Sequence, residues 1–353
     1  MRGDVPQAGE GKRFGLKRHA MRKVLILIQG FEVPGSRYRI LQYLPYLEAA
    51  GLDCRVMKFP GSFMGSLRLL GMLPAYDCVF VQKKRVHGPM LTLLRKRAGR
   101  IVYDFDDAVM YRDSFSSSPY SKTRQKRFAD MVRSSDHVIA GNSFLLEHAL
   151  GINRNATLIP TSLDIGRIAV KSRPAPADRV VIGWIGSRAT IGYLRMFQDV
   201  WEELGRRYPA KVELKIVCDT FFDCGHIPVR KVAWAGETEN DELRTMDIGV
   251  MPVTDDPWSR GKCGFKILQY FASGVPAVAS PVGVNRDLVL HGVTGFQAAD
   301  RGEWLAHLSR LVEDAALREK MGLAGRKLLE QGYTVDVNAP KLAAILKGET
   351  PAP

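Results

Sequence analysis

Two successive series of short apolar runs, with helix-like stretches between them, constrain the fold of this chain more than any other feature. Residues 23–29 (KVLILIQ) form a continuous apolar run, as expected of a strand buried on both faces, and residues 38–50 then carry apolar side chains at helical spacing. Further apolar runs occupy residues 54–57, 78–81, 101–103 and 137–140, and a second series occupies residues 180–185, 212–217, 231–234, 248–251 and 277–279. Because strands that alternate with helices build parallel sheets, the pattern predicts an α/β fold with two doubly wound parallel-sheet domains.

The length of 353 residues agrees with two domains that face each other across a cleft. A polar, proline-containing stretch at residues 160–173 places the domains at 21–165 and 166–353, and the last helix could pack back on the first domain. Residues 1–20 carry five basic residues and no apolar run, so we expect a disordered basic tail there. Ligands of such sheets bind beyond the carboxyl ends of the strands, where we therefore look for chemistry.

The cysteines and the hydropathy pattern limit the cellular location. The five cysteines are an odd number and form no Cys-x-x-Cys pair, which indicates a reducing compartment and no structural zinc. No segment reaches the roughly 18 consecutive apolar residues that a membrane span needs. We therefore expect a cytoplasmic protein that could lie peripherally on the inner face of a membrane.

The positive charge is concentrated in the first half of the chain. Residues 1–165 hold 26 Lys and Arg against 14 Asp and Glu, whereas the remainder holds 25 against 23. This excess predicts an anionic partner for the first domain, either a lipid surface, a phosphorylated acceptor or nucleic acid. A basic face that is merely solvated is the alternative.

Residues 260–276 (RGKCGFKILQYFASGVP) carry the strongest chemical signal. Gly261 and Gly264 allow the backbone to approach a ligand, Lys262 and Lys266 offer cations, and a helix from about Phe265 presents free N–H groups. A helix terminus supplies only about half a positive charge, so a bound diphosphate also needs a side-chain cation such as Lys266. The segment therefore predicts a phosphate site, the alternative being a lysine that only decorates a helix.

The segments ASGVP (272–276) and GVTGF (292–296) resemble the second domain of the retaining glycosyltransferases of family 4, which have two Rossmann-like domains (the GT-B fold). The resemblance implies a nucleoside diphosphate sugar, with UDP or GDP, bound by the second domain and an acceptor bound by the first. It also implies transfer with retention of configuration, without a metal or other cofactor. We expect the acceptor to be a cell-surface glycan or a lipid-linked molecule of the cell envelope, as in polysaccharide or lipopolysaccharide biosynthesis.

The chain departs from the hallmark of that family, two glutamates separated by seven residues. Gly261 and Gln269 stand at those positions, and KILQYFA (266–272) is closer to a branch that reads Lys-x-x-Glu-Tyr-Met-Ala. The resemblance assigns the second position to the donor ribose, which Gln269 could still hydrogen-bond. The acid that usually meets the donor sugar has no evident replacement.

Other landmarks of the family follow in the expected order. The resemblance places Gly186, Ser187 and Arg188 near the donor phosphates and Trp234 in the loop that borders the nucleobase, although a plain surface arginine remains an alternative at Arg188. The full set that we expect to bind the donor is Gly186, Ser187, Arg188, Trp234, Lys262, Gln269, Val282, Gly283 and Val284.

Two loops of the first domain are expected to face the cleft. Gly35, Arg37 and Arg39 follow the first strand, and the two arginines could meet phosphate on the donor or the acceptor, or lie on the surface at the start of a helix. In YDFDD (103–107), we expect Asp106 or Asp107 to contact the acceptor hydroxyl, and we predict Lys266, Asp106 and Asp107 as the catalytic residues. The alternatives are carboxylates that cap the following segment, or a metal site from Asp104-x-Asp106, which is a weak motif.

Basic and apolar residues interleave over residues 83–100, next to residues 63–74. This arrangement would suit a membrane-surface helix that buries Met90, Leu91, Leu93 and Leu94, but a core helix with a basic end fits equally well. Nucleic acid is a weaker candidate partner, because no aromatic residues are interleaved with these charges.

Two rival functions remain open. The chain could be a nucleotide-sugar epimerase of the same fold, or a non-catalytic nucleotide-sugar-binding subunit of a polysaccharide assembly complex. A dehydrogenase is disfavoured, because no Gly-x-Gly-x-x-Gly follows the first strand of either domain.

Overall fold

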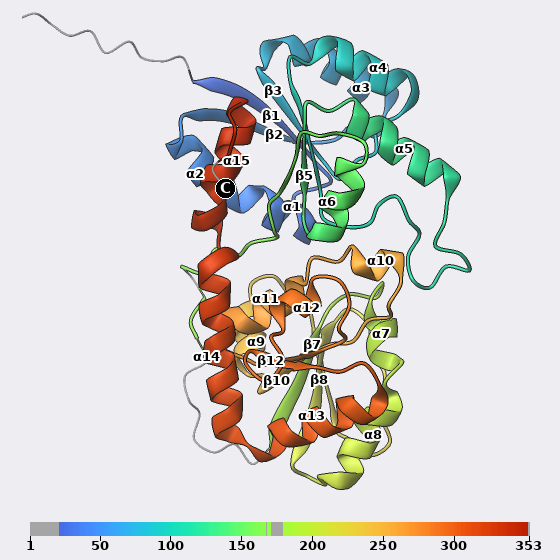
Figure 1. Cartoon of the computed structure of the whole chain (residues 1–353), viewed down its shortest axis with the longest axis vertical. Coiled ribbons are helices and arrows are strands. Elements are labelled where there is room, and N and C mark those ends of the chain that lie inside the picture. The colour runs from blue at the N-terminus through green and yellow to red at the C-terminus, as the bar shows by residue number, and fades with distance from the viewer. Residues whose placement is uncertain (1–20, 167, 171–178, 352–353) are drawn as a thin grey trace, which may run out of the picture.

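The computed structural model describes residues 21–166, 168–170 and 179–351, which form two α/β domains stacked end to end (Figure 1). The basic stretch 1–20, predicted as a disordered tail, lies outside the described residues. Each domain has a six-stranded parallel sheet with a buried apolar cluster on either face. The expected fold class of two doubly wound parallel sheets is confirmed.

In the first domain the strand order is β2-β1-β3-β4-β5-β6, and all neighbours are parallel. The strands are β1 (Arg22–Ile28), β2 (Leu52–Lys58), β3 (Cys78–Gln82), β4 (Ile101–Phe105), β5 (His137–Ala140) and β6 (Ala156–Leu158). The helices are α1 (Pro34–Arg39), α2 (Leu44–Ala49), α3 (Phe63–Met72), α4 (Gly88–Arg97), α5 (Lys122–Arg133) and α6 (Ser143–Leu150), with 3-10 turns η1 (Leu41–Tyr43) and η2 (Leu73–Ala75).

In the second domain the order is β12-β11-β10-β7-β8-β9, again parallel. The strands are β7 (Val180–Ile185), β8 (Val212–Cys218), β9 (Val229–Ala233), β10 (Ile248–Met251), β11 (Ala277–Ala279) and β12 (Gly295–Gln297). The helices are α7 (Ile191–Arg195), α8 (Gln198–Arg207), α9 (Glu239–Arg244), α10 (Pro257–Arg260), α11 (Phe265–Ala272), α12 (Asn285–Leu288), α13 (Arg301–Glu313) and α14 (Ala315–Gly332), and the chain continues into α15 (Val335–Lys347).

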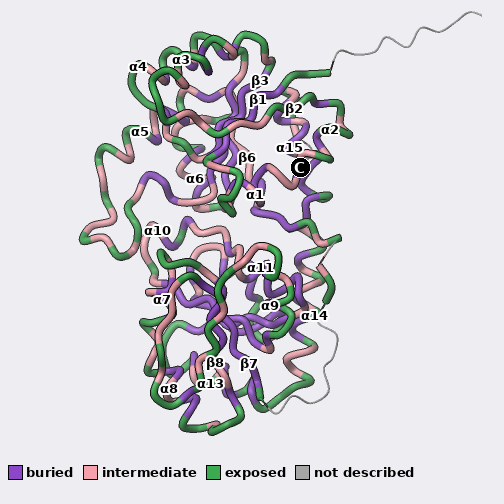
Figure 2. The backbone as a smooth tube through the Cα atoms, turned by 180° about the vertical axis from the view of Figure 1, so that it is seen from behind, coloured by how far each residue is buried: buried purple, intermediate pink, exposed green. Residues whose placement is uncertain are grey.

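Every predicted apolar run forms a strand, and the buried residues are concentrated along these strands (Figure 2). The edge strands β6 and β12 were not predicted. Each has three residues, one of them polar, and so forms no continuous apolar run. Their extended conformation is stabilised by pairing with the neighbouring strands β5 and β11.

The prediction of one helix over residues 38–50 is wrong. The segment is divided among α1, η1 and α2, because Ile40 leaves the helical conformation at φ −146° and Pro45 stands in the first turn of α2. Proline lacks an N–H and clashes with the preceding turn, so it is tolerated at the start of a helix but not inside one.

The last helix returns to the first domain (Figure 1). Val335, Leu342 and Ile345 of α15 are buried with Val24 and Ile26 of β1 in one apolar cluster. The second domain therefore ends with α14, and α15 ties the two domains together.

The helix over residues 88–97 is α4, but two of its three leucines face the protein. Leu91 and Leu94 are buried in the core of the first domain, so the prediction that they are available to a membrane is wrong. Leu93 is 40% exposed. Among the described residues, no helix combines the length and hydropathy needed to cross a bilayer.

Candidate functional site

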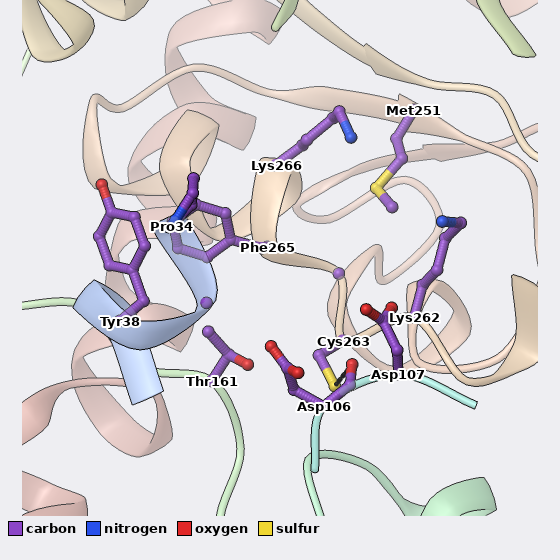
Figure 3. A pocket seen from close by; sticks show the side chains of 12 residues that line it. Pro34, Tyr38, Asp106, Asp107, Thr161, Met251, Lys262, Cys263, Phe265 and Lys266 are labelled. Atoms are coloured by element: carbon purple, nitrogen blue, oxygen red, sulfur yellow. Dashed lines mark hydrogen bonds between the residues drawn. The ribbon is translucent and has the colours of Figure 1, made fainter. Parts of the chain in front are cut away.

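A cavity of about 170 Å³ lies between the two domains (Figure 3). The first domain contributes the segments that follow β1, β4 and β6, and the second contributes the end of β10 and the start of α11. The walls are formed by Pro34, Gly35, Tyr38, Asp106, Asp107, Thr161, Met251, Lys262, Cys263, Gly264, Phe265 and Lys266.

The N-terminus of α11 reaches this cavity with two lysines beside it. Gly264 precedes the helix at φ +64°, where a Cβ would also clash with α12, so the turn requires glycine. The ammonium of Lys266 lies 5.5 Å from the centre of the Trp184 ring, and that of Lys262 lies 5.3 Å from the centre of the Tyr193 ring. In the part of the chain that the structure describes, neither ammonium has a carboxylate oxygen within 4.0 Å. This wall therefore holds positive charge that an anionic ligand would neutralise.

Burial makes both lysines easier to deprotonate. The pKa of Lys266 is lowered to about 8, first by burial and then by the nearby charge of Lys262, against a smaller opposing effect of Asp107. Burial also lowers the pKa of Lys262. A bound diphosphate would raise the pKa of both lysines again, because an adjacent negative charge favours the ammonium form.

Asp106 and Asp107 form the opposite wall, and Lys83 holds them in place. Its ammonium lies 2.9 Å from Oδ1 of Asp106 and forms an ion pair with Asp107. Burial would raise the pKa of Asp106, but Lys83 and Arg39 outweigh it and keep the pKa below its usual value. Asp106 is therefore a carboxylate at neutral pH, able to accept a hydrogen bond from a hydroxyl group. Figure 3 shows Asp106 and Asp107 on the side of the cavity opposite Lys266.

The loop before α11 is docked on the first domain. A Cβ at Gly261 would lie 2.5 Å from the Cβ of Ala108 and 2.7 Å from its backbone nitrogen. Asn142 donates a hydrogen bond of 2.9 Å to the carbonyl of Lys262, and the thiol of Cys263 donates one of 3.2 Å to the carbonyl of Asp106. A glutamate at position 261 therefore cannot fit in this arrangement, which gives a steric reason for the departure from the family hallmark.

Glu239 of α9 joins the two domains beside the cavity. It accepts hydrogen bonds from the Tyr38 hydroxyl at 2.6 Å, from Arg37 at 2.8 Å and from the Trp234 indole at 3.1 Å. Arg37 and Trp234, which were predicted separately, thus meet in the structure. Both bind the carboxylate of Glu239, and neither lines the cavity. Trp234 is still 38% exposed.

Arg39 does not line the cavity. Its guanidinium is bonded to both carboxylate oxygens of Asp104 and donates a 2.7 Å hydrogen bond to the carbonyl of Ile159. Both side chains of the pair are 2% exposed. Arg39 is therefore placed to hold the end of β4 rather than to meet phosphate, and Asp104 is not free to join Asp106 in a metal site. The described residues contain no group of three or more His, Cys, Asp or Glu that could hold a metal ion.

The remaining predicted donor residues lie in the second domain, away from the cavity wall. The Arg188 side chain is 77% exposed, donates a hydrogen bond of 3.1 Å to Thr220 and lies 4.0 Å from a carboxylate oxygen of Asp219. Gln269 is 4% exposed within α11. Gly186 and Ser187 follow β7, and Val282, Gly283 and Val284 precede α12. Of the predicted set, the structure brings Gly35, Asp106, Asp107, Lys262 and Lys266 together.

Sequence reasoning missed Lys83, Tyr38 and Glu239. Lys83 follows β3, which lies next to β4 in the sheet, so its position at a strand end was a usable signal for a partner of Asp106. The contact between Tyr38 and Glu239 joins residues 201 positions apart, and no local pattern indicates it.

Comparisons with known proteins identify the architecture. Residues 179–314 match the family model of the glycosyl transferases group 1. The structure of HepE from Anabaena, solved with UDP and glucose, superposes with a TM-score of 0.68 at 16% identity, over 93% of this chain and 100% of that one. The fold is the GT-B glycosyltransferase fold.

Other solved GT-B structures agree. A sucrose-phosphate synthase from Thermosynechococcus elongatus gives a TM-score of 0.72 at 14% identity, and a glycosyltransferase from Rickettsia africae gives 0.69 at 12%. Each alignment covers 93% of this chain and 98% of the other. No curated protein matches the sequence. The family match and the GT-B fold together support a glycosyltransferase.

Proposed function

We propose that this protein transfers a sugar from a nucleoside diphosphate sugar to an acceptor hydroxyl in the cavity between its domains. The observation that carries the proposal is the charge arrangement of that cavity. Lys266 and the N-terminus of α11 lie on one wall, Asp106 and Asp107 lie on the other, and Lys262 lies on the side of Asp107. Among the described residues, neither lysine has a carboxylate oxygen within 4.0 Å. The first wall suits a diphosphate, and the second suits a hydroxyl group.

In this proposal each wall has a separate task. The bond between the anomeric carbon and the diphosphate oxygen breaks, a bond between that carbon and the acceptor oxygen forms, and the proton of the acceptor hydroxyl passes to the departing diphosphate. Lys266, Lys262 and the α11 N–H groups stabilise the negative charge that develops on the diphosphate. Asp106, held ionised by Lys83, accepts the hydrogen bond of the acceptor hydroxyl and orients it.

We extend the proposal to the finer expectations of the family resemblance. Transfer retains configuration, the protein cations replace a metal at the diphosphate, and the donor carries UDP or GDP. HepE, whose structure was solved with UDP and glucose, favours UDP. The acceptor is a glycan or a lipid-linked molecule, and the excess of basic residues in residues 1–165 supports one that carries negative charge. A cytoplasmic location is supported by the odd number of cysteines without a Cys-x-x-Cys pair.

Nucleotide binding is expected to raise the melting temperature. At a ligand concentration of a hundred times Kd, a ligand that binds only the folded state stabilises it by about 2.7 kcal/mol. A thermal-shift series with UDP, GDP, their sugars and ADP as control measures this effect, and UDP should give the largest rise. If no nucleotide changes the melting temperature, the proposed function is wrong. Turnover of the donor to a new nucleotide sugar without an acceptor would indicate an epimerase instead.

UDP affinity is expected to fall as the pH rises through about 8. The ammonium of Lys266 binds the diphosphate, and its pKa of about 8 in the free protein means that it becomes neutral between pH 7.5 and 9.5. Because one proton is lost, the affinity for UDP should fall by at most about tenfold per pH unit. Calorimetry over that pH range measures the fall. Lys266→Arg is the control. Because arginine stays charged over this pH range, the part of the pH dependence that comes from Lys266 should disappear. An equal pH dependence in both proteins would contradict the role of Lys266.

A further inference from the structure

The first half of α3 exposes three large apolar side chains. Phe63 is 80% exposed, Met64 71% and Leu67 54%, and their spacing places them on one side of the helix. The other side of α3 is already used, because Leu69 and Leu70 are buried in the core of the first domain. Single exposed apolar residues are normal on a protein surface, whereas a contiguous apolar patch with a polar rim is characteristic of an interaction site.

The surroundings of this helix are strongly basic. Residues 55–100 contain ten Lys and Arg and a single acidic residue, Asp77. Lys83 and Arg95 are paired with aspartates outside this segment. Among the described residues, six exposed basic side chains of the segment have no ion-pair partner: Arg55, Lys58, Arg68, Lys84, Lys96 and Arg97.

Local contacts connect the apolar side chains with these charges. The ammonium of Lys84 lies 5.6 Å from the centre of the Phe59 ring, shortly before α3, and Arg97 of α4 reaches the carbonyl of Leu70 at 3.4 Å. Figures 1 and 2 show α3 and α4 side by side at the end of the first domain that is remote from the second. Lys84 also adjoins Lys83, the partner of Asp106 in the cavity.

We propose that this α3 surface, made of Phe63, Met64 and Leu67 with Lys58, Arg68 and Lys84, binds the surface of a bilayer that contains anionic lipids. Apolar side chains without polar atoms enter the boundary between headgroups and acyl chains, while lysines and arginines around them meet the negative headgroups. Nucleic acid fits less well, because stacking would need aromatic residues among the charges, and only Phe63 is an exposed aromatic of α3. The inference goes beyond sugar transfer and does not depend on the donor.

The surface also corrects the sequence-based expectation of a membrane helix. That expectation relied on residues 83–100, in which Leu91 and Leu94 are buried, whereas α3 supplies the exposed apolar side chains. Because α3 belongs to the first domain, a bilayer bound there would lie on the domain that we expect to hold the acceptor.

Vesicle sedimentation of the full chain tests the proposal. We expect binding to phosphatidylcholine vesicles that contain about a third phosphatidylglycerol, at least tenfold weaker binding to pure phosphatidylcholine, and weakening with added salt. The triple variant Phe63→Ser, Met64→Ser, Leu67→Ser should bind the anionic vesicles at least tenfold more weakly, and Arg68→Glu with Lys84→Glu should remove the preference for anionic lipid. Met196→Ser with Leu323→Ser is the matched control, because these side chains are 46% and 52% exposed on the second domain.

The possible outcomes separate this proposal from the proposed function. The replaced side chains are exposed, so the variants should keep their melting temperature and their response to UDP. Unchanged vesicle binding by the triple variant, or no binding by the unmodified protein, overturns the membrane proposal and leaves sugar transfer untouched. A dimer in gel filtration that the triple variant converts to a monomer would assign the surface to a second copy of the chain and also overturn it.

Discussion

Replacement of Lys266 by methionine is expected to slow sugar transfer by at least about a hundredfold and to weaken UDP binding. The ammonium is the cation in the first turn of α11, and loss of one preorganised charge or donor at a developing anion typically costs on the order of 100-fold to 1,000-fold in rate. Because the side chain packs against Trp184, methionine keeps most of its volume and contacts. Initial rates with a radiolabelled donor and calorimetry with UDP measure the two effects.

The same replacement should make the free protein more stable at pH 7. Burial disfavours the charged lysine and lowers its pKa in the folded state from the ordinary 10.5 to about 8. The charged Lys266 therefore lowers the free energy of unfolding, and this loss of stability is present in full below about pH 8. It disappears as the pH rises from 8 to 10.5, and the difference in melting temperature between the two proteins should shrink over that range. Higher stability together with lost binding is the signature of a functional cation.

Lys327→Met is the matched control, since Lys327 is exposed on α14 and lies outside the cavity. It should leave the transfer rate, UDP binding and stability unchanged. Full transfer activity in the Lys266→Met protein would remove Lys266 from the mechanism. If both variants lose activity, the effect comes from the general charge of the protein.

Replacement of Arg39 by methionine is expected to cost about 3–5 kcal/mol of folding stability, the usual effect of leaving one charge of a buried pair without its partner. Arg39 and Asp104 are each 2% exposed, and Arg39 also bonds to the carbonyl of Ile159. The pair therefore connects α1, β4 and the segment after β6. Urea denaturation gives the free energy of unfolding.

Two further variants test this interpretation. Arg260→Met breaks a pair of similar geometry with Asp255, with contacts of 2.7 and 3.2 Å, but this pair is about half exposed and should contribute less than about 1 kcal/mol. The double variant Arg39→Met, Asp104→Leu should recover part of the lost stability, because no unpaired charge remains. A loss below 1 kcal/mol for Arg39→Met alone would show that Asp104 does not need its partner.

The predicted donor loop illustrates what local sequence features can reveal. Glycine at position 264 and an apolar helix after it predicted that α11 begins beside a ligand site with Lys266 in its first turn, and the structure places both on the cavity wall. Residues that determine a turn or a helix start act through their own backbone and their near neighbours. Such features are therefore readable without the tertiary structure.

Two arginines of the first domain show what local sequence features cannot predict. Arg37 and Arg39 have the same residue type and lie two positions apart, yet one bonds to Glu239 of the other domain and the other is buried against Asp104. The choice depends on which loops the sheet order brings near each arginine. The sequence shows both arginines, but it does not reveal which carboxylate pairs with each of them.

The sequence by itself determined two parallel sheets, ten of their twelve strands and the position of Lys266 at a helix start, because periodicity and glycine turns are local properties. Only the tertiary structure decided that Lys83 holds Asp106, that Ala108 leaves no room for a side chain at Gly261, and that α15 returns to the first domain. These contacts join residues that are distant along the chain. Their free energy comes from packing and charge pairing between elements, and it exists only once these elements are packed together.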